Sequence, residues 1–412
     1  MDLQIQTVQL SAELETLASF SEAPAPAVTR VVFSGTDRKA RECVKSLCAA
    51  AGLVIREDAV GNTFARWVGS EPGLAAVATG SHIDTVPNAG RYDGTVGVLG
   101  GLEAIRALQR SGFRPRRSIE LVIFTSEEPT RFGIGCLGSR LLAGVLEPAA
   151  DTRLVGKGGG TLNHWRTVAG FAGDLASVRL PQGHYAAFVE LHIEQGPLLE
   201  RAGIPLGVVT AIAAPASLRI RIEGEGGHAG AVLMLVRKDA LCAAAELVLA
   251  VESAAKSSGS IDTVATVGIC EVFPGAVNSI PSEVRLEVDV RDTNGARRDR
   301  VLAEIQSACQ AAAKRRAAAV EMETINADPP AQCDAAVVES LIRACAARGI
   351  AFQTMVSRAY HDSLFMSRIT PTAMLFIPCR GGMSHRPDEY ASPEAIANGV
   401  LALGEALREL AS

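Results

Sequence analysis

The stretch Ile119–Glu128 reads IELVIFTSEE, an apolar run that ends in two hydroxyl side chains and two adjacent acids. A short apolar run bounded by turn residues is typical of a strand that is buried on both faces of a parallel sheet. Three more runs of this kind lie at Leu74–Thr79, Phe188–Ile193 and Ala373–Ile377. Residues 39–52 and 96–110 have helical periodicity instead. The alternation predicts an α/β fold, with a mixed, mostly parallel sheet flanked by helices.

The middle of the chain has a different pattern. Residues 214–328 begin with an alternating strand and continue as helix, strand, strand, helix and strand, at Ser217–Ile222, Arg237–Lys256, Thr263–Val272, Glu283–Arg291, Arg297–Arg316 and Val320–Ile325. This βαββαβ order predicts a ferredoxin-like α+β domain. Because candidate catalytic residues lie on both sides of it, we expect residues 1–213 and 329–412 to form one catalytic domain with residues 214–328 inserted into it.

Composition narrows the class of protein. The 412 residues are 48% hydrophobic and 21% charged, which is enough to bury the cores of two domains. A formal net charge of -5, without a basic stripe, argues against a nucleic-acid partner. Nine cysteines without a CxxC pair indicate a reducing compartment, and we expect the cytoplasm. The stretch Met1–Leu14 is polar and acidic, so neither a signal peptide nor a membrane span is expected there.

Five potential metal ligands occur in short motifs that read as strand ends or tight loops: His82, Asp93, Glu128, His192 and His385. Any one of these motifs alone is compatible with an ordinary turn or surface residue. Functional residues of open α/β sheets collect at the carboxyl ends of strands, and most of these five follow a predicted strand. Three imidazoles and two carboxylates hold two divalent ions if one carboxylate, Asp93, bridges ions about 3.5–4 Å apart. Ligands without thiolate suit zinc, manganese, cobalt or nickel.

A spare acid beside a ligand indicates hydrolysis. With Glu128 on a metal, Glu127 is left to take a proton from the attacking water and pass it to the leaving nitrogen. A solvated surface pair of acids is the alternative. Asp84 follows His82 by two positions, and we expect its carboxylate to accept the imidazole N–H and fix the tautomer.

Other polar residues carry weaker signals. His228, in the inserted region, is either a loop histidine or a donor to the oxyanion that arrives by domain closure or from a neighbouring subunit. Arg291 offers a fork suited to a carboxylate, or it forms a local ion pair with Asp289 or Asp292. Three further residues near turns or strand ends say little in isolation: Gln195, Asn278 and His361.

Together these motifs resemble the aminoacylase-type dinuclear metallohydrolases, and within them the branch of allantoate, N-carbamoyl amino acid and ureidoglycolate amidohydrolases. The resemblance runs from Gly61 to Pro393, and its most specific phrase is FVELHIEQGP at Phe188–Pro197. It implies that His82, Asp93 and His192 hold one metal, and that Asp93, Glu128 and His385 hold the other. It also implies that Glu127 is the general base, that His228 reaches the active site of a partner subunit, and that Gln195, Asn278, Arg291 and His361 contact substrate. Two divalent ions, commonly manganese, and a homodimer through the inserted dimerisation or lid domain are implied as well.

Details within the branch favour one substrate. The usual GHAGTTPM is GHAGAVLM at residues 227–234, which looks like plant-type ureidoglycolate amidohydrolases, as do SRAYHDSLFM at 357–366 and TSEEPTRF at 125–132. We therefore expect cleavage of the ureido amide of (S)-ureidoglycolate to ammonia, carbon dioxide and glyoxylate, as part of ureide and purine catabolism. Allantoate or N-carbamoyl-L-amino acid hydrolysis is the alternative. Two other hypotheses are a non-catalytic binding module and a thiol amidase that uses Cys136 or Cys379.

Overall fold

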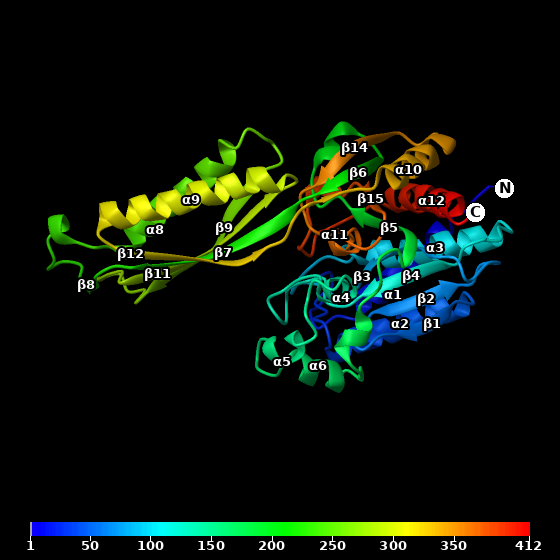
Figure 1. Cartoon of the computed structure of the whole chain (residues 1–412), viewed down its shortest axis with the longest axis horizontal. Coiled ribbons are helices and arrows are strands. Elements are labelled where there is room, and N and C mark those ends of the chain that lie inside the picture. Colours follow the sequence, from blue (N-terminus) through cyan, green and yellow to red (C-terminus); the bar gives the residue numbers. More distant parts are fainter. Residues whose placement is uncertain (1) are drawn as a thin grey trace. The chain divides into compact units, whose positions relative to one another are not determined.

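The computed structural model describes residues 2–412 (Figure 1). Its contacts divide the chain into two compact units. The first unit comprises the chain up to Thr210, Cys333–Met355 and His361–Ser412, and the second comprises Ala211–Gln332 and Val356–Tyr360. These bounds differ by a few residues from the expected insertion at 214–328. The sequence pattern gave no sign that the short stretch Val356–Tyr360 belongs with the second unit.

A nine-stranded sheet forms the centre of the first unit. At one end of this sheet, residues 211–212, 331–332 and 356–357 are assigned to the second unit. Its strands, in sheet order, are β1 (Val54–Glu57), β2 (Thr63–Trp67), β4 (Ile119–Phe124), β3 (Ala76–His82), β5 (Tyr185–Ile193), β15 (Thr372–Ile377), β6 (Leu206–Ile212) and β13 (Ala331–Gln332), with β14 (Phe352–Ser357) beside β6. The four central strands, β4, β3, β5 and β15, are parallel. The flanking pairs β1–β2, β2–β4, β15–β6 and β6–β13 are antiparallel. The predicted α/β fold with a mixed sheet is confirmed, and its parallel strands are those in the centre of the sheet.

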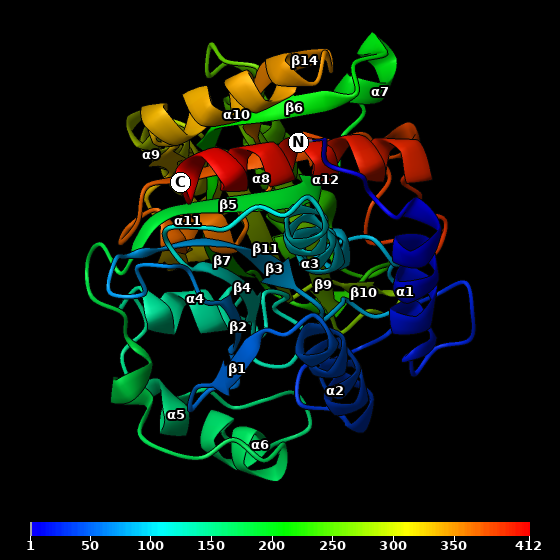
Figure 2. The same ribbon diagram turned by 90° about the vertical axis from the view of Figure 1, so that its right-hand side faces the viewer.

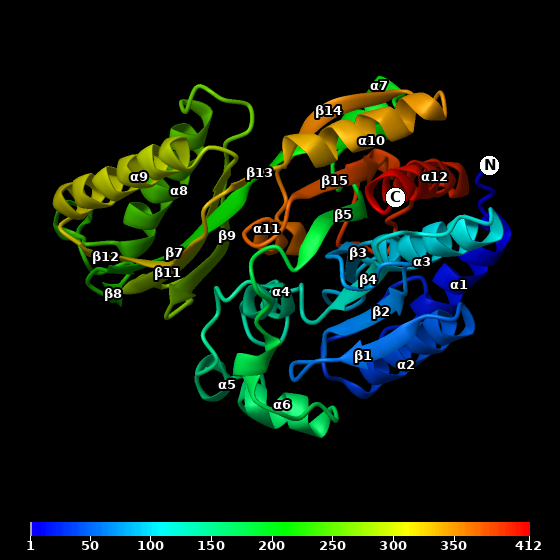
Figure 3. The same cartoon turned by 45° about the vertical axis from the view of Figure 1, so that its right-hand side comes forward.

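Successive residues of the central strands serve two cores, because side chains alternate between the faces of a sheet. Leu121 and Ile123 pack into one core and Val122 and Phe124 into the other, all at 1% exposure or less. Helices α3 and α12 lie side by side along the first face (Figures 2 and 3). The helices that contribute to this first core are α1 (Thr7–Ser19), α2 (Gly35–Ala50), α3 (Thr95–Arg110), α10 (Ala335–Ala347) and α12 (Pro393–Leu410).

Glycine allows α3 to lie close to the sheet. A Cβ atom at Gly97 would come within 2.3 Å of the carbonyl oxygen of Leu191 on β5. The second core is covered by shorter elements and loops. The remaining short helices of the first unit are α4 (Leu137–Leu142), α5 (Ala150–Arg153), α6 (Leu162–Val168), α7 (Leu198–Ala202) and α11 (Asp362–Met366), with 3₁₀ turns at Leu175–Val178 and Arg380–Gly382.

The second unit has the predicted βαββαβ order. Its elements are β7 (Ala214–Glu223), α8 (Ala240–Lys256), β9 (Val264–Phe273), β11 (Glu283–Asp292), α9 (Gly295–Arg316) and β12 (Ala319–Ala327). The strands form an antiparallel sheet in the order β12-β7-β11-β9, which confirms the ferredoxin-like topology. A separate two-stranded ribbon pairs β8 (Gly227–His228) with β10 (Ser279–Ile280), and a 3₁₀ turn spans Met234–Val236. Among residues 2–412, no helix has both the length and the apolar character needed to cross a membrane.

Candidate metal centre

The predicted ligands of the first unit gather at one edge of its sheet. His82 is the last residue of β3, Glu127 and Glu128 follow β4 by three and four positions, and His192 is the penultimate residue of β5. His385 lies in the loop between β15 and α12. Because these four strands are parallel neighbours, their carboxyl ends meet.

Asp93, in the turn before α3, lies between the histidines. Its Oδ1 atom is 3.2 Å from Nε2 of His192 and 3.6 Å from Nε2 of His82. Its Oδ2 atom is 3.2 Å from Nε2 of His385, and that nitrogen is 3.4 Å from Oε1 of Glu128. The five side chains therefore form two sets that share Asp93: His82, Asp93 and His192, and Asp93, Glu128 and His385.

The chemistry of these side chains fits divalent cations. In each set the ligating atoms lie within 4.8 Å of one another. Burial and the charge of Asp93 raise the pKa of Glu128 to about 7, since two carboxylates repel each other in a poorly solvated site. A divalent cation held by both carboxylates would relieve that repulsion. Imidazole nitrogens and carboxylate oxygens suit the borderline metals of the first transition row and zinc.

Backbone carbonyls orient two of the histidines. Nδ1 of His82 donates to the carbonyl oxygen of Asp84 at 3.0 Å, and Nδ1 of His192 donates to that of Ile193 at 2.9 Å. Both rings therefore carry the proton on Nδ1 and present the Nε2 lone pair, which in His192 accepts the backbone N–H of Gly94 at 3.1 Å. The expectation that the Asp84 carboxylate fixes the His82 tautomer is wrong, because its Oδ1 atom is 3.8 Å away from Nδ1.

The Asp84 carboxylate instead holds the acidic loop that follows β4. It accepts the backbone N–H groups of Glu127 at 3.3 Å and Glu128 at 3.1 Å. On the other side of the loop, three successive N–H groups at the start of α4, from Cys136, Leu137 and Gly138, donate to the carbonyls of Glu127, Ser126 and Thr125. These contacts hold Ser126 at a positive φ of 58°, a strained conformation for this residue type.

Glu127 is enclosed beside the two ligand sets. The residue is 8% exposed, its Oε2 atom is 3.7 Å from Nε2 of His82, and its Oε1 atom accepts from the thiol of Cys136 at 3.4 Å. Burial raises the pKa of Glu127 well above its usual value, although the charge of His82 opposes the shift. A carboxylate with a raised pKa beside a cation site suits a group that takes up a proton and later releases it.

Two predicted substrate residues also lie at this centre. Nε2 of Gln195 donates to Oδ2 of Asp93 at 2.8 Å and to Oγ of Ser384 at 3.3 Å. The buried ring of His361 lies against that of His192, with 4.5 Å between the ring centroids. The structure thus brings together eight of the eleven predicted site residues, and all eight belong to the first unit.

Comparison with known proteins places the chain in a family. Residues 78–409 match peptidase family M20/M25/M40. The chain belongs to this family. Proteins similar to this chain include the ureidoglycolate hydrolase of Arabidopsis thaliana, which is 54% identical over 99% of this chain and 87% of its own length. The N-carbamoyl-L-amino acid amidohydrolase of Geobacillus stearothermophilus is 37% identical over 99% of both chains.

A solved structure agrees with this assignment. The crystal structure of AtUAH in complex with glyoxylate superposes with a TM-score of 0.93 at 54% identity and covers 100% of this chain and 99% of that one. M20 membership accords with metal binding, and the ligand sets around Asp93 are the candidate site for it.

The three other predicted site residues belong to the second unit. His228 lies opposite Ser279 in the β8–β10 ribbon and is exposed, as is Asn278 beside it. Arg291 pairs with Asp289 at 2.7 Å, which is the local ion pair considered from the sequence. Its guanidinium also lies over the ring of Tyr360, 5.4 Å from the centroid.

Sequence reasoning missed Glu389, a buried acid that contacts the turn of Asp93. Its partners Tyr92 and Asp93 are almost 300 positions away, at separations of 297 and 296 residues, so no local pattern connects them. The only available signal was its place four positions after the predicted ligand His385.

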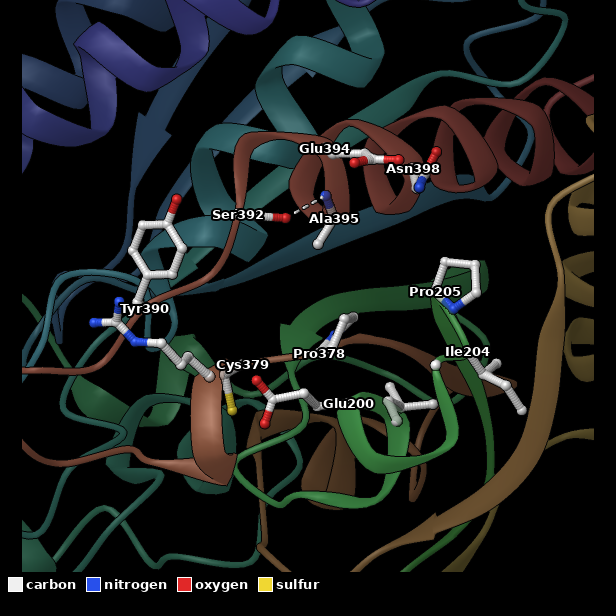
Figure 4. A pocket seen from close by; sticks show the side chains of 13 residues that line it. Glu200, Ile204, Pro205, Pro378, Cys379, Tyr390, Ser392, Glu394, Ala395 and Asn398 are labelled. Carbon is white, nitrogen blue, oxygen red and sulfur yellow. Dashed lines mark hydrogen bonds between the residues drawn. The ribbon is translucent and has the colours of Figure 1, made fainter.

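Neither Cys136 nor Cys379 has the surroundings of a catalytic nucleophile. Cys379 lines a hollow of about 460 Å³ under the loop after β15 (Figure 4). None of the residues that line this hollow is a histidine, and the carboxylates of Glu200 and Glu394 are among them. Burial raises the pKa of Cys379 to about 12 and that of Cys136 well above its usual value. Both sulfurs are therefore protonated and weakly nucleophilic near neutral pH.

Proposed function

We propose that this protein is a metal-dependent amidohydrolase that cleaves the ureido amide of (S)-ureidoglycolate. The observation that carries the proposal is the Asp93 carboxylate shared between two ligand sets, with the enclosed carboxylate of Glu127 beside them. The choice of substrate is supported by 54% identity to the ureidoglycolate hydrolases of Arabidopsis thaliana and of rice. Relatives named for other ureides are more distant, at 37% for the carbamoyl enzyme and 32% for the allantoate amidohydrolase of Bacillus subtilis.

His82, Asp93 and His192 would hold one divalent ion, and Asp93, Glu128 and His385 the second. Such a pair of cations supplies positive charge that polarises a carbonyl group and makes water more acidic. Manganese is the proposed metal, and zinc, cobalt and nickel share its preference for these ligands.

Glu127 has the central part in the proton transfers. It accepts a proton from the water that attacks the ureido carbonyl carbon, and it delivers that proton to the terminal nitrogen as the C–N bond breaks. Ammonia leaves, and the remaining carbamate loses carbon dioxide to give hydroxyglycine, which decays to glyoxylate and a second ammonia. Structures of the similar protein AtUAH are known in complex with (S)-hydroxyglycine and with glyoxylate, the two compounds that this scheme produces.

The remaining polar groups would bind the substrate. We assign His228 the role of hydrogen-bond donor to the oxyanion, and Arg291 the role of clamp for the carboxylate. Gln195, Asn278 and His361 would contact the ureido and hydroxyl groups. We further propose a homodimer through the second unit, to be tested by light scattering. A cytoplasmic location remains a prediction, and it is supported by nine free cysteines.

Replacing Arg291 with alanine is expected to raise KM for ureidoglycolate about 10- to 100-fold and to change kcat little. The loss corresponds to a charge-assisted hydrogen-bond pair of about 1.5–3 kcal/mol. Steady-state kinetics of ammonia release measure it. Arg285→Ala is the matched control, because Arg285 lies on the same strand β11 and also pairs locally, with Glu283. An unchanged KM in Arg291→Ala would remove the clamp from the proposal.

The proposed function is tested by ammonia release from ureidoglycolate, allantoate and an N-carbamoyl-L-amino acid with manganese-loaded protein and a chelator control. Chelator-sensitive turnover that prefers ureidoglycolate is the expected result. A preference for another ureide would replace the substrate and keep the site. Metal-loaded protein that turns over none of the three would favour the binding-module hypothesis.

A further inference from the structure

Glu389 connects two loops of the candidate metal centre. Its Oε1 atom accepts the backbone N–H groups of Tyr92 at 2.8 Å and Asp93 at 3.1 Å. Its Oε2 atom accepts from the hydroxyl of Ser384 at 2.8 Å. Glu389 is 4% exposed, so these contacts replace solvent for a buried acid. One carboxylate thus joins the turn before α3 to the loop between β15 and α12.

Ser384 extends this connection to the ligands. Its hydroxyl lies 2.9 Å from Oδ2 of Asp93 and accepts from Nε2 of Gln195 at 3.3 Å. The next residue is His385, whose backbone has a positive φ of 58°, a conformation that a histidine keeps only when its surroundings fix it. Glu389 therefore acts on the backbone of Asp93 directly and on the loop of His385 through Ser384.

The turn before α3 is shaped to receive this carboxylate. A Cβ atom at Gly90 would lie 2.3 Å from Cβ of Glu389 and 2.4 Å from its Oε1 atom. Gly90 does not have a positive φ, so its backbone conformation is open to other residues. The absence of a side chain at position 90 therefore serves the approach of Glu389.

We propose that Glu389 is a positioning residue that sets Asp93 against His385, so that the ligand set Asp93, Glu128 and His385 forms only with Glu389 in place. This inference rests on the proposed metal centre. The other set depends less on Glu389, because His82 and His192 lie within strands β3 and β5. Groups that orient ligands from behind typically contribute 10- to 100-fold in metal affinity or activity.

The first test compares Glu389→Ala and Glu389→Gln with the unaltered protein by calorimetric titration with Mn²⁺. Glu389→Ala is expected to bind one ion with near-normal affinity and the second about 10- to 100-fold more weakly. Its kcat should fall more than its KM rises. Glu389→Gln should restore the affinity for the second ion and kcat. Its amide oxygen accepts the same two N–H groups, and its amide nitrogen donates to Ser384, whose hydroxyl then donates to Asp93.

Two further variants separate positioning from general stability. Gly90→Ala should displace Glu389 from the opposite side and weaken the same metal. Glu405→Ala removes another buried acid, which lies on α12. Its carboxylate pairs with Arg348, directly after α10, and with Arg408, which is also on α12. It should lower the unfolding temperature and leave both metals and the visible spectrum of cobalt-loaded protein unchanged.

The outcomes are distinct. If the unaltered protein binds two ions, and Glu389→Ala and Gly90→Ala also bind two with the same affinities and the same cobalt spectrum, Glu389 does not position the ligands and only this inference falls. If the unaltered protein binds no pair of metals, the proposed function falls and this inference with it. Selective weakening of one ion in both variants, with rescue by Glu389→Gln, supports the inference.

Discussion

Replacing Glu127 with glutamine is expected to lower kcat about 10³-fold while both metals stay bound, since general acid–base catalysis typically contributes 10²- to 10⁴-fold. Glutamine keeps the size of the side chain and still accepts from the thiol of Cys136, which lies 3.4 Å from Oε1. It cannot take a proton from water near neutral pH. KM should change little, because Glu127 is assigned to the proton transfer and not to substrate binding.

The measurement is ammonia release at saturating substrate, together with the metal content of the same sample. Glu120→Gln is the matched control, because Glu120 is also a buried acid of the β4 segment but bonds to the hydroxyl of Tyr185. It should retain kcat. If Glu127→Gln binds metal and its kcat stays within tenfold of that of the unaltered protein, a group other than Glu127 transfers the proton.

Replacing Asp93 with alanine is expected to remove both metals and all turnover above background. Asp93 is the one carboxylate common to the two ligand sets, with Oδ1 toward His82 and His192 and Oδ2 toward His385. Without it each set retains two protein ligands, and the positive charges of two cations lose the anion between them. The loss should therefore exceed that from removing a ligand that belongs to one set.

Metal content after gel filtration and ammonia release measure the Asp93 variant. His385→Ala is the informative comparison, because its side chain is half exposed and belongs to one set alone. It should retain one metal. An Asp93→Ala protein that keeps two tightly bound ions would contradict the bridging role, whatever its activity.

The sequence predicted those parts of the fold that have a local pattern. The central strands were found within a few residues of β3, β4, β5 and β15, because strands buried on both faces are continuous apolar runs. The antiparallel strands at the flanks were not predicted. β1 reads VIRE and is mostly exposed, and β13 has two residues, so neither carries a periodic signal.

In the candidate metal centre, too, the sequence predicted the residues that have a local pattern and missed the contacts that do not. The ligands could be proposed because each follows or ends a recognisable strand or turn. The hydrogen-bond acceptor of the His82 ring could not be predicted. The ring can bond to the carbonyl or to the carboxylate of Asp84, and the course of the backbone after β3 decides between them. Glu389 was missed for another reason, since its partners come from a distant part of the chain.

The position of β15 has a consequence for synthesis. This strand is synthesised after every other strand of the nine-stranded sheet, yet it lies between β5 and β6 in the middle of that sheet. Until it arrives, both neighbours present unpaired apolar edges, which favour aggregation in a nascent chain. The loop that follows β15 carries His385, so the strand that closes the sheet also delivers the last ligand. A chain released before β15 would expose these edges and would lack His385, so the ligand set Asp93, Glu128 and His385 could not form.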